Sequence, residues 1–212
     1  MDIVLNAIGR LSKEKIKIEL PNHKILQYDI PKKIQISSCF FRTGVCIRCG
    51  LCCKKIKPNL YWFLDEEYNQ LPDKVREKLD IIKIKVNGLE RDIYEYKNCD
   101  LIDDNNLCSV HHIKPIECAL LPIFIDQNKY LFTYLRKRKR GRFKIFGCNM
   151  YFTEFDEEAF KEWDLVYLEK LNKIAKYLGV KTFLPEIIEE LKKSVKNKSI
   201  NNNILIWETK KK

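Results

Sequence analysis

Residues 46–53 read CIRCGLCC, a C-x2-C-x2-C-C run that contains four of the nine cysteines of this 212-residue chain. Cysteines at such a density predict either a disulfide framework or a metal site. Two-residue spacers bring several sulfur atoms to one point, as a tetrahedral ion or a cubane cluster requires. We therefore favour a metal site over disulfides. With four cysteines further along the chain, the predicted ligands are Cys46, Cys49, Cys52, Cys53, Cys99, Cys108, Cys118 and Cys148.

The length of the chain and its pattern of apolar residues limit the classes of protein to which it can belong. A chain of 212 residues is long enough for one sizeable domain whose core needs no disulfides. Residues 1–15 hold no continuous apolar segment, so we expect no signal peptide. No window approaches the roughly 18 apolar residues of a membrane helix, so we expect no membrane span. We therefore expect a cytoplasmic protein, in which thiols stay reduced, and this expectation strengthens the metal interpretation.

The chain is basic, with a formal net charge of +11 from 40 Lys+Arg and 29 Asp+Glu. Seven of the nine residues from Arg136 to Lys144 are cationic. Such a stretch suits phosphates or an acidic partner, but a solvated hairpin tip is the favoured interpretation because charged loop tips are common. Nucleic acid is therefore a candidate partner that we do not favour, and a protein partner stays unidentified.

Hydrophobic periodicity predicts a mixture of short strands and helices. Alternation of period two predicts strands over 15–20, 33–37, 81–86, 92–96, 129–135 and 142–147. Asn87-Gly88 fits a type I′ hairpin turn between the third and fourth of these strands.

Helix signals occur in two parts of the chain. Asp65 is predicted to be the N-cap of a first helix, and a second short helix is expected over 72–79. An apolar stripe from Phe155 to Leu178 predicts a long helix that stops at Gly179, and Pro185 begins a last helix.

The predicted fold class is α+β, with a small metal-organised cysteine-rich domain, short antiparallel strands and a C-terminal helical cap. We divide the chain into a β-rich N-terminal segment over 1–39, a cysteine-rich metal-binding domain over 40–150 and a C-terminal helical segment over 151–212.

Several motifs carry a resemblance to a known family. They are Arg48-Cys49-Gly50-Leu51-Cys52-Cys53, Cys99-x8-Cys108-Ser109-Val110, Pro115-x2-Cys118, Leu121-Pro122 and Cys148. The pattern resembles the YkgJ-like CxxCxxCC family of zinc- or iron-chelating domain proteins over about residues 42–150. The chain departs from the family at Lys114 and at Ala119, where arginine is usual, so an anion contact by an arginine pair is not carried over.

The resemblance implies metal binding, and most members of the family have no assigned reaction. Flagellin lysine N-methylases contain a similar cysteine framework, which suggests an iron–sulfur cluster that serves methyl transfer. No methyl-donor site and no Gly-rich nucleotide-binding turn maps onto this chain.

The metal has two candidates. The triplet Cys46, Cys49 and Cys52 suits three irons of one 4Fe-4S cubane, which favours an iron–sulfur cluster. Eight thiols also suffice for two four-coordinate Zn2+ ions. We interpret His111-His112 as loop residues or hydrogen-bond donors to a thiolate, and Cys39 as a buried thiol outside the ligand set.

The predicted function is therefore a cysteine-ligated metal-binding protein with an iron–sulfur cluster for redox chemistry or protein modification. The alternative is a structural zinc module for protein or nucleic-acid interaction. The sequence shows no Ser-His-Asp order and no catalytic carboxylate pair, so catalytic residues and enzymatic activity stay open. The aromatic residues 61–63 are expected to shield the metal loop.

Overall fold

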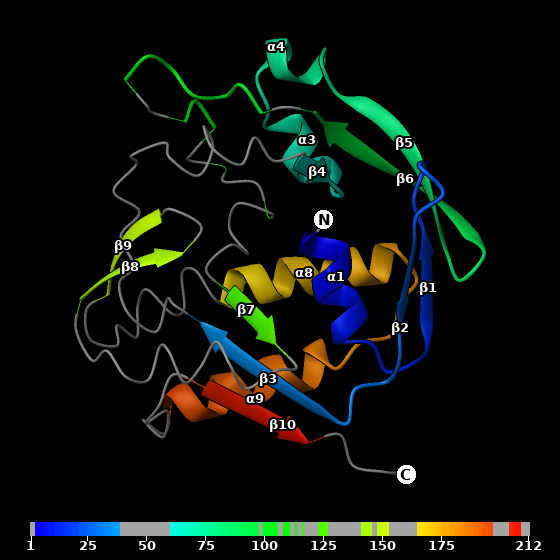
Figure 1. Ribbon diagram of the computed structural model, residues 1–212, viewed down its shortest axis with the longest axis vertical. Coiled ribbons are helices and arrows are strands. Elements are labelled where there is room, and N and C mark those ends of the chain that lie inside the picture. The colour runs from blue at the N-terminus through cyan, green and yellow to red at the C-terminus, as the bar shows by residue number, and fades with distance from the viewer. Residues whose placement is uncertain are drawn as a thin grey trace.

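A computed structural model describes residues 3–38, 60–97, 99–105, 108–110, 113, 116, 123–126, 141–145, 148–152, 165–196 and 204–208. Every strand pairing among these residues is antiparallel. Helices accompany the sheets, so the described part of the chain has the predicted α+β class (Figure 1).

The largest sheet has five strands in the order β2-β1-β5-β6-β4. In that order, the strands are β2 (Ile25–Tyr28), β1 (Ile16–Glu19), β5 (Asp80–Val86), β6 (Leu89–Tyr96) and β4 (Leu60–Trp62). A three-stranded sheet has the order β10 (Ile204–Glu208), β3 (Lys33–Ser38) and β7 (Ile123–Asp126). The strands β8 (Gly141–Ile145) and β9 (Cys148–Phe152) form a third sheet of two.

Five helices are described, and four of them contact the large sheet or one another. The helices are α1 (Ile3–Arg10), α3 (Asp65–Asn69), α4 (Asp73–Arg76), α8 (Val166–Tyr177) and α9 (Leu184–Lys196). The helix α1 contacts β2 and α8, and α8 contacts α9. In Figure 1, α1 and α8 lie beside each other near the centre of the molecule.

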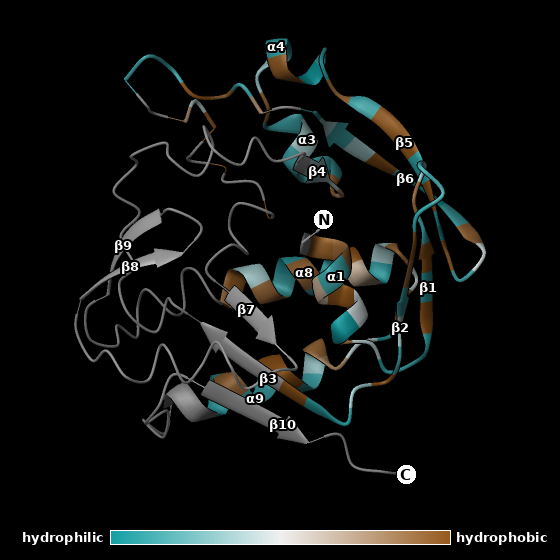
Figure 2. Ribbon diagram, viewed as in Figure 1, coloured by the Kyte–Doolittle hydropathy of each residue, from teal (hydrophilic) through white to brown (hydrophobic). Residues whose placement is uncertain are grey.

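The main core forms between these helices and one face of the large sheet. Along β5, the buried residues Ile84 and Val86 alternate with the exposed Lys83 and Lys85, and Figure 2 shows this alternation of hydropathy. Alternate residues of a strand point to opposite faces, so the apolar face meets the helices and the lysines meet water. The core draws its residues from α1, β1, β5, β6, α8 and α9.

A second and smaller core lies at the other end of the large sheet. Its buried residues are Trp62, Leu71, Val75, Tyr96, Leu101 and Val110. They come from β4, the α3–α4 region, the end of β6 and the turn that follows β6.

The predicted hairpin at Asn87-Gly88 is confirmed. Both residues have positive φ, 49° and 83°, as the two central positions of a type I′ turn require. The predicted strands over 15–20 and 33–37 correspond to β1 and β3, but the two belong to different sheets.

One residue prediction is wrong. The helix α3 includes Asp65, and its N-cap is Leu64, which has extended backbone and makes no side-chain capping hydrogen bond.

The predicted strand over 142–147 corresponds to β8. Its partner among the described residues is β9, a strand that the hydrophobic periodicity did not indicate. The expected strand over 129–135 lies outside the described residues. The helix α1 and the strand β10 were not predicted from sequence.

Candidate metal centre

The structure describes the side chains of two predicted ligands, Cys99 and Cys108, and both are half-buried. Neither of them forms a disulfide within the described part of the chain. Cys148 is the first residue of β9, and its backbone pairs with that of Ile145 in β8. The other predicted ligands, together with Cys39 and His111-His112, lie outside the described residues.

A tight turn carries both described thiols. An antiparallel bridge pairs Ile102 with Cys108, and the Ser109 backbone N–H donates to the Leu101 carbonyl at 2.8 Å. At the tip, the Asn105 N–H donates to Asp103 Oδ1 at 2.9 Å, which is the Asx geometry that favours a turn. Residues 99–102 and residues 108–109 therefore form two paired arms, with one cysteine on each arm.

The small core forms the apolar wall of this turn. Cys99 and Cys108 both pack against the core that contains Trp62 and Tyr96. The ring of Trp62 is fully buried and meets Tyr96 edge to face, with centroids 6.3 Å apart. Such a wall excludes water from one side of the thiols. Of the aromatic residues 61–63, Trp62 lies in this small core, whereas Phe63 belongs to the main core.

A polar network fixes the start of the turn. Asp100 follows Cys99 directly and accepts hydrogen bonds from Lys78 Nζ at 2.8 Å and from the hydroxyl of Tyr96. Burial raises the pKa of Tyr96 well above its usual value, and the hydrogen bond to Asp100 adds to the shift. The donors Lys78 and Tyr96 lower the pKa of Asp100.

This network ties the arm that carries Cys99 to two other parts of the chain. Lys78 lies just before β5, and Tyr96 is the last residue of β6. Sequence reasoning missed all three network residues. The only local signal is that Asp100 adjoins a predicted ligand, whereas its partner Lys78 is 22 residues away.

Two buried polar atoms near β4 find no hydrogen-bond partner among the described residues. They are Trp62 Nε1 and Glu67 Oε2. Burial also raises the pKa of Glu67, although Lys170 Nζ lies 3.4 Å from its Oε1. Residues 39–59, which contain the CIRCGLCC run, lead directly into β4 and lie outside the described residues.

The donor chemistry of the described turn fits a soft metal. Thiolates are ligands of zinc and of iron–sulfur clusters. The thiols of Cys99 and Cys108 are only half-buried, so either kind of metal centre can reach them. Within the described residues, no three Cys, His, Asp or Glu side chains gather closely enough to hold an ion. The turn therefore supplies two candidate donors and not a complete site.

Comparison with known proteins agrees with the chemistry of the cysteines. Residues 45–140 match the model of the CxxCxxCC family, described as "Putative zinc- or iron-chelating domain". This is the family that the cysteine motifs resemble, so the resemblance is confirmed over that stretch. No curated protein and no solved structure gives a significant match to the chain. Among the helices that the structure describes, none is long and apolar enough to cross a membrane.

Proposed function

We propose that this protein binds metal through cysteine thiolates and carries an iron–sulfur cluster used in redox chemistry or protein modification in the cytoplasm. The observation that carries the proposal is the CIRCGLCC run inside a stretch that matches a zinc- or iron-chelating domain. Two further thiols of the same stretch, Cys99 and Cys108, are held half-buried on one turn, which supports a role as ligands.

The proposed ligands fall into two groups. Cys46, Cys49, Cys52 and Cys53 form the first group, and the triplet spacing within it suits a cubane. The second group is Cys99, Cys108, Cys118 and Cys148. We propose that residues 40–150 form the metal-binding part and that α8 and α9 belong to a C-terminal helical cap over it.

The residues around Cys99 would position and protect the ligand. Asp100 accepts hydrogen bonds from Lys78 and Tyr96, which link the residue next to Cys99 to the end of β6 and to the segment before β5. Trp62 covers the apolar side of the turn and limits the access of water. A bound cluster supplies one-electron chemistry, which zinc does not.

Metal analysis of protein prepared without oxygen tests the proposal. We expect a brown protein with about four irons and four sulfides per cluster, whose visible absorption bleaches with dithionite. Stoichiometric zinc without iron in such a preparation would remove the redox function and favour the alternative, a structural zinc module for protein or nucleic-acid interaction.

Cysteine variants test the ligand assignment separately from the metal's identity. Cys49→Ala and Cys52→Ala should each lower the metal content and partly unfold the chain, because thiolate binding energy is also folding energy. The matched control is Cys39→Ala, a cysteine outside the motif, which should leave the metal content unchanged. Full metal content in both the Cys49 and the Cys52 variants would contradict the assignment.

A further inference from the structure

The indole of Trp62 is a buried hydrogen-bond donor without an acceptor. Its ring is fully buried in the small core, and its Nε1 is one of the two buried polar atoms that find no partner among the described residues. Nearly all buried polar groups in native proteins are paired, and each exception calls for an explanation. An indole N–H can only donate, so the group that it lacks is an acceptor.

Neighbouring rings set the position of this indole. Trp62 pairs with Tyr94 across β4 and β6, and its ring meets that of Tyr96 edge to face at an interplanar angle of 82°. Both tyrosines belong to β6, so aromatic side chains of two paired strands hold one another in place. Because a protein core is close-packed, the N–H has to meet its acceptor where the ring stands.

The small core contains few side chains that can accept a hydrogen bond. Its described members and the side chains packed against it are aliphatic or aromatic, apart from two cysteines. The side-chain acceptors are therefore the hydroxyls of Tyr94 and Tyr96 and the sulfur atoms of Cys99 and Cys108. None of these four accepts a hydrogen bond from the indole as the side chains stand.

The oxygen acceptors of this region are directed elsewhere. The Tyr96 hydroxyl donates to Asp100, and the Tyr94 ring stacks on Tyr68 of α3 with centroids 4.5 Å apart. Glu67 holds the second buried atom without a partner, but its carboxylate lies beside Lys170 of α8 and does not accept from the indole.

Sulfur differs from these oxygens because metal binding changes its strength as an acceptor. A neutral thiol is a weak acceptor, and a cysteine has to be a thiolate to hold a metal. Hydrogen bonds to a charged acceptor are shorter and about twice as strong as neutral ones. A metal centre at Cys99 and Cys108 would therefore bring a strong acceptor to the core that contains the Trp62 indole.

We propose that the Trp62 N–H donates a hydrogen bond to a sulfur atom of the metal centre, either a cysteine thiolate or the sulfide of a cluster. The inference rests on the proposed function, which supplies the metal. Trp62 is then a positioning residue and not a ligand. Its N–H offsets negative charge on the sulfur, which strengthens metal binding and raises the reduction potential of a cluster.

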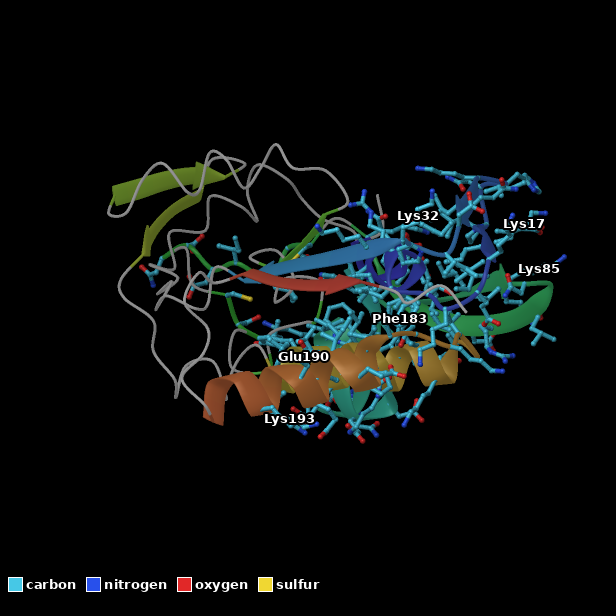
Figure 3. The ribbon with its side chains drawn as sticks, turned by 90° about the horizontal axis from the view of Figure 1, so that it is seen from below. Lys17, Lys32, Lys85, Phe183, Glu190 and Lys193 are labelled. Carbon is cyan, nitrogen blue, oxygen red and sulfur yellow. The ribbon has the colours of Figure 1, made fainter. Side chains whose placement is uncertain are left out.

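Replacement of the N–H alone tests this role. The full chain is prepared with benzothienylalanine at position 62, a tryptophan analogue in which sulfur replaces the N–H and the shape of the ring is kept. The control has the same replacement at Trp207 of β10, a strand that lies beside β3 in the three-stranded sheet (Figure 3). Trp62→Phe, which also lacks the donor, repeats the test if the analogue does not fold.

Metal affinity is measured by competition with a chelator for the metal that the chain carries as purified. Loss of a group that hydrogen-bonds to a ligand typically weakens metal binding 10–100-fold. We expect about tenfold weaker binding with the analogue at position 62 and a change within about twofold at position 207. If the metal is a cluster, its reduction potential should become more negative only in the position-62 protein.

The stability of the chain without metal separates this role from ordinary packing. The analogue at position 62 removes a buried donor that has no described partner, so the chelated chain should unfold at the same urea concentration as wild type or at a higher one. A side chain that served packing alone would give the same change with and without metal.

Loading of the same proteins with zinc alone distinguishes the two sulfur acceptors, because the zinc form contains no sulfide. Weaker binding of zinc by the position-62 analogue assigns the hydrogen bond to a cysteine thiolate. Weaker binding confined to the cluster assigns it to sulfide.

Two results would overturn the inference and leave the proposed function standing. The first is equal affinity of wild type and the position-62 analogue for both zinc and a cluster. The second is an analogue that lowers the stability of the chelated chain as much as it lowers that of the metal-loaded chain. A wild-type chain that binds neither metal would contradict the proposed function as well.

Discussion

Two neighbouring carboxylates of α3 show how burial decides the behaviour of a residue. The side chain of Glu67 is 3% exposed and lies 3.4 Å from Lys170, whereas that of Glu66 is 69% exposed and lies 3.5 Å from Lys173. Burial raises the pKa of Glu67 above its ordinary value of 4.5 despite the nearby lysine. Its Oε2 accepts no hydrogen bond from the residues that the structure describes, so desolvation of the charged form is only partly compensated.

The raised pKa of Glu67 predicts a pH-dependent cost. Between pH 4.5 and the higher pKa of the folded state, the folded chain binds more protons than the unfolded chain, so stability falls as pH rises through this window. Glu67→Gln stays neutral and should escape that loss. We therefore expect the stability of the variant relative to wild type to rise between pH 4 and pH 7 by about 1 kcal/mol, measured by urea unfolding.

The control for this prediction is Glu66→Gln, which removes a similar but exposed pair. Exposed pairs contribute little, so the difference between this variant and wild type should not change measurably with pH. A Glu67→Gln variant that follows wild type at every pH would show that the buried carboxylate titrates normally.

At the residue scale, the type of residue was enough to indicate the family but not to locate the first residue of α3. The cysteine motif alone identified the family that residues 45–140 match. Asp65 was wrongly predicted as an N-cap, because three successive acidic residues, Asp65, Glu66 and Glu67, all suit a first helical turn. The extended backbone at Leu64, with φ −115° and ψ 135°, decides where the helix begins.

At the scale of elements, the end of α8 shows a local signal that the structure confirms. Gly179 has φ of 74°, and its N–H donates to the Lys176 carbonyl at 3.0 Å. The Val180 N–H donates to the Ala175 carbonyl at 2.8 Å, which completes a Schellman motif. Arg91 of β6 also donates to a carbonyl of the last turn, that of Tyr177, at 3.1 Å.

Substitution of Gly179 tests this helix end. Gly179→Ala forces a side chain into left-handed backbone, and its Cβ would approach Arg91 Nη2 at 3.3 Å. We expect a loss of about 1–2 kcal/mol in the free energy of unfolding. Gly179→Asn should lose less, because asparagine tolerates this conformation. Equal stability of the alanine variant and wild type would show that the motif does not limit the stability of the fold.

At the scale of the whole molecule, the unequal sizes of the two cores predict the order in which they loosen. Among the residues that the structure describes, the main core holds 24 buried residues, none of them a cysteine, and the small core holds six and adjoins Cys99 and Cys108. A core of few residues stabilises its elements less and depends more on other links.

Removal of metal should therefore act locally. After treatment with a strong chelator, we expect hydrogen exchange to increase by at least about tenfold around Trp62, Leu101 and Val110. Exchange in α8 and α9 should change little, because their buried faces belong to the main core. Uniform loss of protection across both cores would mean instead that metal holds the whole fold together.

The contacts that join distant parts of the chain were beyond sequence reasoning. An isolated bridge pairs Ser12 with Thr182, and β10 pairs with β3 although some 170 residues separate them. The helix α1 packs against Tyr28 through Gly9, a contact that no periodicity indicates.

Local patterns alone were enough to indicate the family through the cysteine motif. They were also enough to predict the type I′ turn at Asn87-Gly88, the end of α8 at Gly179 and the alternation of buried and exposed residues along β5. Each of these depends on residues within a few positions of one another, because dihedral preference and side-chain periodicity act over one or two turns of chain. Tertiary structure decided which strands share a sheet, that Asp100 accepts hydrogen bonds from Lys78 and Tyr96, and that the Glu67 carboxylate is buried away from water. Those outcomes depend on the packing of segments that meet only in the folded chain, and burial, which sets their energies, is a property of the whole molecule.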